Sequence, residues 1–450
     1  MKKFSSLFII VFILLSTPGC NKKSASLNPA NPITLNMWHV YGEQADSPMH
    51  RYVEEFNSTV GKQKGVIINV TLLSNAQKIG GQLLSAQKNV PGVPSMPDLF
   101  FCHNSNAAQL GKDNLLHWND VFSDKELKEF VPSFLKDGIV EDSLCVLPVS
   151  KSTHLLFLAG GSFDRFSEKT GYGSKDLATW DGFFEVAKKY YEYSGNKPFC
   201  AIDYVMRSVE LDAISKGATD FYDENGWYKD NDIILNSYKM FAESIAKGYI
   251  IVSDLYSNTQ VMTGETIAGI SSSAAVLYYN DTITYPDNTS EKMDLRVLPV
   301  PTTAAGSKYA TQAGVGLCAY KTTAIKAEAA TVFAKWFTEK KRNLDFVAQT
   351  GYMPVKNGAF EVLDDYPFEN LSDNSYKNET FKITLAAMKT TKDTCTFLSE
   401  NSAAGYYPNT YKLYDNIRKL QRTLKEKYSS GSTAEEITNE LTELFRNTGK

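Results

Sequence analysis

Alternation of apolar and polar residues predicts that the globular part of the chain opens with a strand and a helix. Over 33–38, apolar residues alternate with Thr and Asn, a period of two that is typical of a half-buried strand. Over 47–56, Ser and Pro suit a first helical turn and apolar residues then recur on one face. Further strands are predicted at 66–73 and 98–103. Strands that alternate with helices indicate βαβ units, a mostly parallel sheet and an α/β fold.

The same alternation continues toward the C-terminus. Two apolar, strand-like runs flank Ser150–Thr153, and Thr179 suits the N-cap of a helix with an apolar face. No internal repeat of solenoid period is present. Further predicted elements are strands at 295–300 and 315–320, a helix with an apolar stripe at 329–337, and a last helix whose capping box is Thr433 with Glu436.

The first residues have the pattern of an export signal. Two lysines precede the apolar run Leu7–Leu15, which is shorter than the about 20 residues that a transmembrane helix needs. Gly19 and Cys20 follow this run and resemble a lipobox. The resemblance implies that residues 1–19 are a lipoprotein signal peptide and that the sulfur of Cys20 carries a diacylglycerol. An ordinary secretory signal with an incidental cysteine is the alternative. Residues 20–32 are polar and are expected to form a flexible tether.

Length, charge and cysteine usage narrow the class of protein. Residues 20–450 are more than one hydrophobic core usually serves, so two lobes are predicted. A formal net charge of −4 and the absence of a basic block argue against nucleic-acid binding. Since the other thiols are not spaced as pairs, we expect small buried cysteines rather than disulfides or metal ligands. Those in apolar runs are Cys102, Cys145, Cys200 and Cys318.

Sequence motifs of catalysis are missing from the chain. There is no phosphate-binding GxxxxGK[ST] loop, no GxSxG nucleophile elbow and no HExxH zinc motif. The five histidines are scattered without the spacing of metal ligands. We therefore expect a protein that is not an enzyme and that needs neither a metal nor a cofactor.

Several short motifs resemble one known family when they are taken in order. They are WH at the end of the first strand, LPVSKSTHLLFL, TWDGFFEVAKKY, GETIAGISSS, LPVP, EAATVFAKWF and TGYMPV. In this order, from Trp38 to the last helix, the chain resembles the family 1 extracellular solute-binding proteins. WHVYGE, LPVSKST, ISSSAA and TGYMPV are most similar to its glycerol-3-phosphate-binding branch. The chain departs from that branch at 400–405, where the branch has an arginine, and at Tyr204 and Arg207, where it has tryptophans.

The resemblance implies the arrangement of the chain in space. Such proteins have a two-lobed, type II periplasmic-binding-protein fold, with several chain crossovers and a ligand cleft between the lobes at the carboxyl ends of strands. Hinge closure of this class is among the known examples of domain motion. We expect 33–150 with 311–352 to form the first lobe, and 151–310 with 353–450 the second.

Aromatic and acidic residues at the end of the first predicted strand are candidates for a sugar site. A polyhydroxylated ligand needs flat aromatic surfaces and side chains that donate and accept hydrogen bonds. We expect Trp38 and Tyr41 to stack on the ligand and Glu43 to accept from its hydroxyls, with His39 beside them. A core position for Trp38 and a solvated Glu43 are the alternatives.

Hydroxyl residues and glycines at predicted turns are further candidates. Ser152 and Thr153 lie at the first crossover, where turn chemistry is the alternative. Ser271, Ser272 and Ser273 precede an expected helix start whose free N–H groups can bind an oxygen or anion. N-capping there accounts for one serine but not for three. The remaining candidates are Gly314 and Gly316 for close backbone approach, Tyr352 and Tyr204 as aromatic side chains, and Arg207 as a partner for phosphate.

With the family resemblance, these residues predict the substrate-binding lipoprotein of an ABC importer, anchored on the extracytoplasmic face of the cell membrane. It is expected to be a monomer that captures a sugar or polyol derivative and delivers it to the permease subunits. A glycerol-3-phosphate- or glycerophosphodiester-binding protein of the same family is the first alternative. A surface glycoside hydrolase, which needs two carboxylates about 5–9.5 Å apart, and an adhesin without a small ligand are the others.

Overall fold

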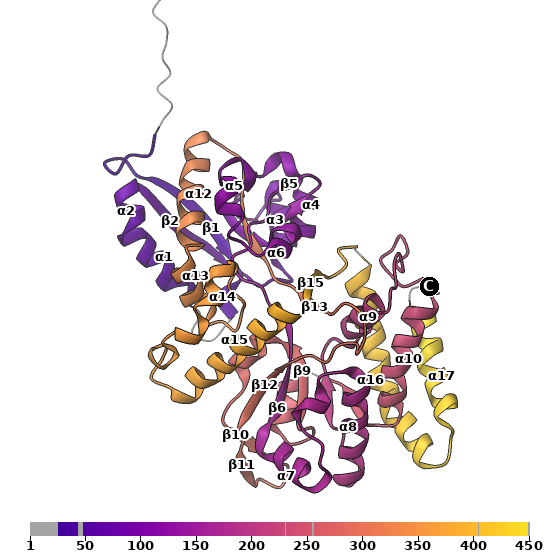
Figure 1. Cartoon of the computed structure of the whole chain (residues 1–450). Coiled ribbons are helices and arrows are strands. Elements are labelled where there is room, and N and C mark those ends of the chain that lie inside the picture. Colours follow the sequence, from indigo (N-terminus) through magenta and orange to yellow (C-terminus); the bar gives the residue numbers. More distant parts are fainter. Residues whose placement is uncertain (1–25, 44–47, 230, 254–255, 404, 449–450) are drawn as a thin grey trace, which may run out of the picture.

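The computed structural model describes residues 26–43, 48–229, 231–253, 256–403 and 405–448. Within them the chain forms two α/β lobes, each built around its own sheet (Figure 1). The predicted signal peptide and the candidate lipidation site lie outside the described residues. None of the described helices is both long and apolar enough to cross a membrane.

A four-stranded sheet with the order β14-β3-β1-β2 forms the centre of the first lobe. Strand β1 pairs in parallel with β2 and β3, whereas β14 runs antiparallel to β3. Both faces are covered, because the successive residues Met37 and Trp38 of β1 pack into two different hydrophobic clusters. The strands are β1 (Ile33–His39), β2 (Val66–Leu73), β3 (Leu99–Cys102) and β14 (Gly316–Ala319).

The helices of the first lobe form where apolar residues recur on one face. In the first of them, Tyr52, Val53 and Phe56 are buried, and Thr323 caps another by accepting from the backbone N–H of Lys326. These helices are α1 (Met49–Ser58), α2 (Val60–Lys64), α3 (Ile79–Gln87), α4 (Asn104–Leu110), α5 (Asp124–Leu127), α6 (Pro132–Asp137), α12 (Ala324–Phe337), α13 (Lys340–Val347) and α14 (Asn357–Glu361).

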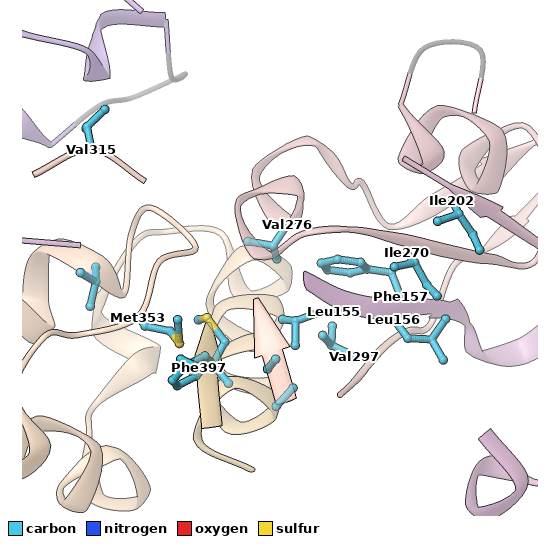
Figure 2. Close-up of a cluster of buried hydrophobic side chains, with 14 of the residues drawn as sticks. Leu155, Leu156, Phe157, Ile202, Ile270, Val276, Val297, Val315, Met353 and Phe397 are labelled. Atoms are coloured by element: carbon cyan, nitrogen blue, oxygen red, sulfur yellow. The ribbon is translucent and has the colours of Figure 1, made fainter. Parts of the chain in front are cut away.

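A five-stranded sheet with the order β12-β6-β9-β7-β8 forms the centre of the second lobe. Figure 2 shows Leu155, Leu156 and Phe157 of β6 packed among apolar side chains of neighbouring elements. Such continuous apolar runs belong to strands that are buried on both faces. The strands are β6 (His154–Ala159), β7 (Cys200–Ile202), β8 (Ile250–Val252), β9 (Ala268–Ser272) and β12 (Leu295–Pro299).

The helices of the second lobe start with the caps that the sequence predicts. Thr179 accepts from the N–H of Gly182, and Thr433 and Glu436 cap each other's backbone N–H groups, as a capping box does. These helices are α7 (Gly160–Thr170), α8 (Trp180–Tyr193), α9 (Val205–Ser215), α10 (Asp232–Ala246), α11 (Ser257–Met262), α15 (Ser375–Thr394), α16 (Tyr406–Ser429) and α17 (Ala434–Thr448).

Chain segments from three parts of the sequence lie side by side between the lobes. The backbone of Ser152 exchanges hydrogen bonds of 3.0 and 3.1 Å with Ala313, and that of Lys151 exchanges bonds of 3.3 and 2.6 Å with Met353. Next to them, β13 (Tyr309–Gln312) pairs in parallel with β15 (Thr396–Ser399). Figure 1 shows this pair between the two sheets. The lobes are therefore joined by short hydrogen-bonded segments that can serve as a hinge.

The structure differs from the sequence-based expectation for the second sheet, and we propose changes to two of the expected boundaries. The second sheet is mixed rather than mostly parallel, because β6 runs antiparallel to both β9 and β12. The chain begins to pack before the expected end of the tether, since Leu27 contacts the main hydrophobic core. After the third crossover, Val355 still accepts from the N–H of Val131, and α14 packs on α13. We therefore propose that the last part of the first lobe extends to α14.

The predicted buried thiols are confirmed. Cys102, Cys145, Cys200 and Cys318 are free and fully buried within strands and adjoining segments. Among the described residues, no three His, Cys, Asp or Glu side chains are grouped in a way that could hold a metal ion.

Candidate functional site

The carboxyl ends of strands from both sheets point to the junction between the lobes. In the first lobe, β1 ends at His39 and leads into the short helix η1 (Tyr41–Glu43). In the second, β7 ends before Asp203 and Tyr204, and β9 ends at Ser272. Open α/β sheets place their ligands at such ends. The residues around these ends form the candidate site.

Tyr41 is a buried support of the site rather than an exposed ring. Its side chain is 1% exposed, and its hydroxyl oxygen lies 3.0 Å from that of Ser150 at the first crossover. Its ring meets the ring edge of Tyr352, with centroids 6.4 Å apart. Burial raises the pKa of Tyr41 above its ordinary value, so the phenol stays neutral. Tyr41 therefore connects the end of β1 to the hinge and to the half-buried Tyr352.

His39 offers a buried hydrogen-bond donor without a partner. Its Nδ1 accepts from the backbone N–H of Tyr41 at 3.2 Å, so the proton of the neutral ring sits on Nε2. Burial, with the nearby His50 as a second cause, lowers the pKa of His39 to about 4. No described residue accepts from Nε2, although His39 is fully buried. An unpaired buried donor calls for an acceptor that the described part of the chain does not supply.

Two buried hydroxyls at the same junction are also unpaired. The Oγ1 of Thr153 and the Oγ of Ser273 have no hydrogen-bond partner among the described residues. The two residues are adjacent in space, because the N–H of Ser273 donates to the carbonyl of Thr153 at 2.7 Å. A Cβ on Gly351 of the first lobe would come within 3.0 Å of the Ser273 carbonyl oxygen. These hydroxyls therefore lie where the two lobes touch.

Three of the other candidate hydroxyls are hydrogen-bonded to the backbone. The Ser272 hydroxyl accepts from the N–H of Ala274 at 3.4 Å and caps a short 3-10 helix, not an α-helix. The hydroxyls of Ser271 and Ser152 donate to backbone carbonyls at 3.5 and 3.4 Å. Capping thus accounts for one serine of the triplet, as expected, while Ser273 remains available.

The stacking role predicted for Trp38 does not fit its position. Its ring is 1% exposed and packs with Phe100 and Cys318 in the smaller hydrophobic cluster of the first lobe. Its Nε1 donates to the hydroxyl of Thr71 at 3.1 Å. Because successive residues of a strand point to opposite faces, the side chain of Trp38 lies on the other face of the sheet from that of Met37. The alternative, a core tryptophan, is what the structure shows.

The phosphate-binding role predicted for Arg207 does not fit either. Arg207 is 3% exposed, and its donors are taken up by Thr311 at 2.9 Å, Glu210 at 2.9 Å and the carbonyls of Leu398 and Ser399 at 2.5 and 3.1 Å. These partners lie on α9, β13 and β15. Arg207 therefore fastens the helix α9 to the strand pair beside the hinge.

Tyr204 and Gly314 both lie at the junction between the lobes. The Tyr204 ring stacks on His154, with centroids 5.1 Å apart and an interplanar angle of 14°. Burial, with Arg207 as a second cause, lowers the pKa of His154 to about 3. Gly314 has a φ of +121°, which a side chain would strain, and it lies against the crossover at Ser150. Glu43 belongs to η1, but its side chain lies outside the described residues.

Sequence reasoning missed an acidic and aromatic group on the second lobe. Glu400 directly follows β15, and the hydroxyl of Tyr407 donates to its carboxylate. The rings of Tyr407 and Tyr411 are 6.3 Å apart on the first turns of α16. Tyr256, after β8, is 62% exposed. Two tyrosines four residues apart at a helix start were the signal that could have indicated an exposed aromatic surface.

Lys151, a second cation near the junction, is also paired. It is 2% exposed and forms an ion pair with Asp137 at the end of α6. A cavity of about 20 Å³ lined by His154, Asp212 and Thr311 lies on the second-lobe side. That volume holds about one water molecule, so it has no room for a sugar. This small cavity is therefore not the ligand site.

Comparisons with known proteins agree with this fold. A family model described as bacterial extracellular solute-binding protein matches residues 51–373. Among curated proteins, no sequence match was found. The structure is similar to that of the cyclic alpha-maltosyl-1,6-maltose binding protein from Arthrobacter globiformis, with 13% identity, coverage of 93% of this chain and 99% of that chain, and a TM-score of 0.68.

Two further solved structures have the same two-lobed fold. The sugar-binding protein MalE from Xanthomonas citri is 14% identical over 92% of this chain and 98% of its own, with a TM-score of 0.65. UgpB from Mycobacterium tuberculosis, in complex with glycerophosphocholine, is 14% identical over 93% and 98%, with a TM-score of 0.64. Because the family match spans more than half of the chain and the fold agrees along nearly its whole length, this chain belongs to the family of bacterial extracellular solute-binding proteins.

Proposed function

We propose that this protein is the substrate-binding subunit of an ABC importer and that it captures a polyhydroxylated solute at the lobe junction. The single observation that carries this proposal is the group of buried, unpaired polar atoms there: Nε2 of His39, Oγ1 of Thr153 and Oγ of Ser273. A sugar or polyol presents both acceptors for the His39 donor and donors for the hydroxyls. The ligands of the similar proteins, a cyclic maltose derivative and glycerophosphocholine, support the same class.

A neutral sugar or polyol is favoured over a free phosphate as the group that binds at the crossovers. A phosphate needs cations or free N–H groups, and both candidate cations are engaged, Lys151 with Asp137 and Arg207 with Glu210 and two carbonyls. A glycerophosphodiester, with a single negative charge, remains the second candidate because one similar protein was solved with such a ligand.

The remaining parts of the proposal concern the cellular setting. The lipobox-like Gly19 and Cys20 support a lipid anchor, and the family supports a location outside the cytoplasm. The partners would then be the permease subunits in the membrane, which receive the solute from a monomer. Neither the capture of the solute nor its delivery to the permease requires the protein to catalyse a reaction.

The test combines identification of the solute with variants of the unpaired groups. Mass spectrometry of protein released from the membrane should find a copurified sugar or polyol derivative, and calorimetry should confirm its affinity. Ser273→Ala and Thr153→Val should each weaken binding about tenfold, because each leaves one ligand hydroxyl unpaired. Ser244→Ala, a buried serine on α10, is the matched control and should bind normally. If the only binders are amino acids or peptides, or if chromogenic glycosides are turned over, the proposal is wrong.

A further inference from the structure

Four tyrosine rings lie in the neighbourhood of the Glu400 carboxylate on the second-lobe side of the junction. They are Tyr407, whose hydroxyl donates to Glu400, together with Tyr204, Tyr256 and Tyr411. The ring centroids of Tyr407 and Tyr411 are 6.3 Å apart. Burial raises the pKa of both Tyr411 and Tyr204, and the nearby groups Glu400 and Tyr256 raise both pKa values further. We call these four rings and Glu400 the tyrosine cluster. It brings together residues from the ends of β7, β8 and β15 and from the start of α16.

Three of the four rings of the tyrosine cluster are available to a ligand. Tyr256, Tyr411 and Tyr407 are 62%, 49% and 43% exposed, which places them among the most exposed large aromatic side chains of the described residues. Glu400 itself is half-buried. Tyrosine rings carry a negative face that attracts cations, and here that face is combined with a carboxylate that is held by a tyrosine hydroxyl.

The negative charge of the cluster has no free cation to balance it among the described neighbours. The positive charge of Arg207 opposes the burial effect on the pKa of Glu400, but its guanidinium is itself bound to Glu210 and to carbonyls of β15. Lys151 is paired with Asp137, and Arg418, near the end of β8, is paired with Asp415. Burial raises the pKa of the Glu400 carboxyl despite Arg207. A cation beside Glu400 would stabilise the ionised form that burial disfavours.

We propose that the solute carries an ammonium group that binds among the rings of the tyrosine cluster, against the carboxylate of Glu400. This inference rests on the proposed function, in which the polyol part of the same solute binds the unpaired groups at the crossovers. Aromatic rings with a carboxylate stabilise an ammonium ion by cation–π attraction and by charge. A neutral sugar could donate hydroxyls to the carboxylate, but it would gain no attraction between opposite charges. A primary amine on a sugar and a quaternary amine on a polyol ester share this chemistry.

Calorimetry with matched ligand pairs tests the inference on the full mature chain. Glucosamine against glucose tests the primary amine, and choline against its neutral carbon isostere 3,3-dimethylbutan-1-ol tests the quaternary amine. We expect the charged member of at least one pair to bind at least tenfold more tightly than the neutral member. The pair that shows the difference identifies which kind of ammonium the site takes.

Variants of the cluster separate charge from packing. Glu400→Gln should remove the tenfold preference while the neutral member binds as before, and Tyr407→Leu should weaken the charged member more than Tyr407→Phe does. Glu168→Gln, an exposed carboxylate on α7, is the control and should change nothing. Thermal unfolding shows whether each variant is folded. Equal binding within both pairs, or binding of the charged member that Glu400→Gln leaves unchanged, overturns the ammonium site.

The same experiments distinguish a failure of the ammonium site from a failure of the proposed function. If neutral sugars bind and respond to Ser273→Ala but not to Glu400→Gln, the proposed function is supported and the ammonium site is wrong. If no sugar, polyol or ammonium compound binds, and none copurifies, the proposed function fails and the inference fails with it.

Discussion

The hydroxyl oxygens of Tyr41 and Ser150 lie 3.0 Å apart, and this contact joins the short helix η1, just after β1, to the first crossover between the lobes. Both residues are buried. On the other side of the crossover, Ser152 and Lys151 hold the second and third crossovers by backbone hydrogen bonds. The end of the first strand and the hinge are therefore mechanically connected, although 109 residues separate the two side chains in the sequence.

Removing this contact should loosen the hinge. Tyr41→Phe deletes the hydroxyl and leaves that of Ser150 without its partner, so we expect the free energy of unfolding to fall by about 1 kcal/mol. Urea denaturation measures it. Tyr193→Phe, at an exposed position on α8, should change stability by less than about 0.5 kcal/mol. An equal effect of the two substitutions would show that the contact does not stabilise the fold.

Arg207 is expected to stabilise the second lobe rather than to bind the ligand. Arg207→Ala would leave Glu210, which is fully buried, without its ion-pair partner, and such losses cost about 3–5 kcal/mol. The surface variant Arg446→Ala on α17 should cost about 0.5 kcal/mol or less. Urea denaturation and ligand calorimetry together decide the role. A variant that keeps wild-type stability but loses the ligand would restore Arg207 to the binding site.

Asp203 should make stability depend on pH. Burial raises its pKa to about 6, whereas an unfolded aspartate has a pKa near 4. Between these values the folded protein holds more protons than the unfolded chain, so the contribution of Asp203 to stability falls as pH rises from about 4 to about 6. Asp203→Asn removes this loss. The stability of the variant relative to wild type should therefore grow over that window, by at most about 3 kcal/mol.

Stability at each pH must be compared between wild type and Asp203→Asn, because the titration of His39 changes stability with pH in the opposite direction. The lowered pKa of His39 means that the folded protein binds fewer protons than the unfolded chain between about 4 and 6.5, so its contribution rises with pH. This term is common to wild type and variant and cancels in their difference. Thermal unfolding of both proteins at intervals of half a pH unit measures the difference. A difference that is constant across the window would contradict the assignment to Asp203.

Ligand binding should close the two lobes. A solute that contacts His39 in the first lobe and Ser273 in the second favours the closed arrangement by its differential affinity. Small-angle scattering should therefore give a smaller radius of gyration with saturating ligand than without it. The same measurement on Ser273→Ala at a ligand concentration near the wild-type Kd should show less closure. An unchanged profile at saturation would count against hinge closure.

Membrane attachment should depend on Cys20. Lipid on its sulfur would keep the protein with the membrane fraction, and Cys20→Ala should release it or leave an unprocessed precursor. Cys395→Ala, which alters a partly buried cysteine of the second lobe, is the control and should remain attached. Cell fractionation and mass spectrometry of the N-terminus provide the measurement. Native protein recovered wholly soluble, with an unmodified N-terminus, would exclude the anchor.

Local elements of the fold could be predicted because their signals are local. The strand predicted at 66–73 is β2, with the same bounds, and the caps at Thr179 and Thr433 are in place. Period-two alternation and capping depend on residues within a few positions of each other. The second sheet was predicted less well. Apolar runs such as that of β6 fit parallel and antiparallel neighbours equally, and pairing is decided by connections elsewhere in the chain.

Residues of the candidate site could be predicted only where their position at the end of a strand was enough to place them at the junction. The ends of β1 and β9 and the first crossover all meet at the junction, and His39, Thr153 and Ser273 are there with unpaired atoms. Trp38 and Arg207 have residue types that suit a ligand, yet both are satisfied inside the protein. Whether a tryptophan or arginine is free depends on what packs against it from distant segments, and no local pattern carries that information.

The sequence by itself determined the family, many of the strands and helices, and which strand ends would carry polar residues, because these follow from short-range patterns and from their order. Only the tertiary structure decided which polar atoms remain unpaired. The tyrosine cluster unites Tyr204 with Glu400 and Tyr407, which are far apart in the sequence and come together through the pairing of β13 with β15 and the packing of α16. Long-range contacts of this kind arise when the chain buries its apolar surface as a whole.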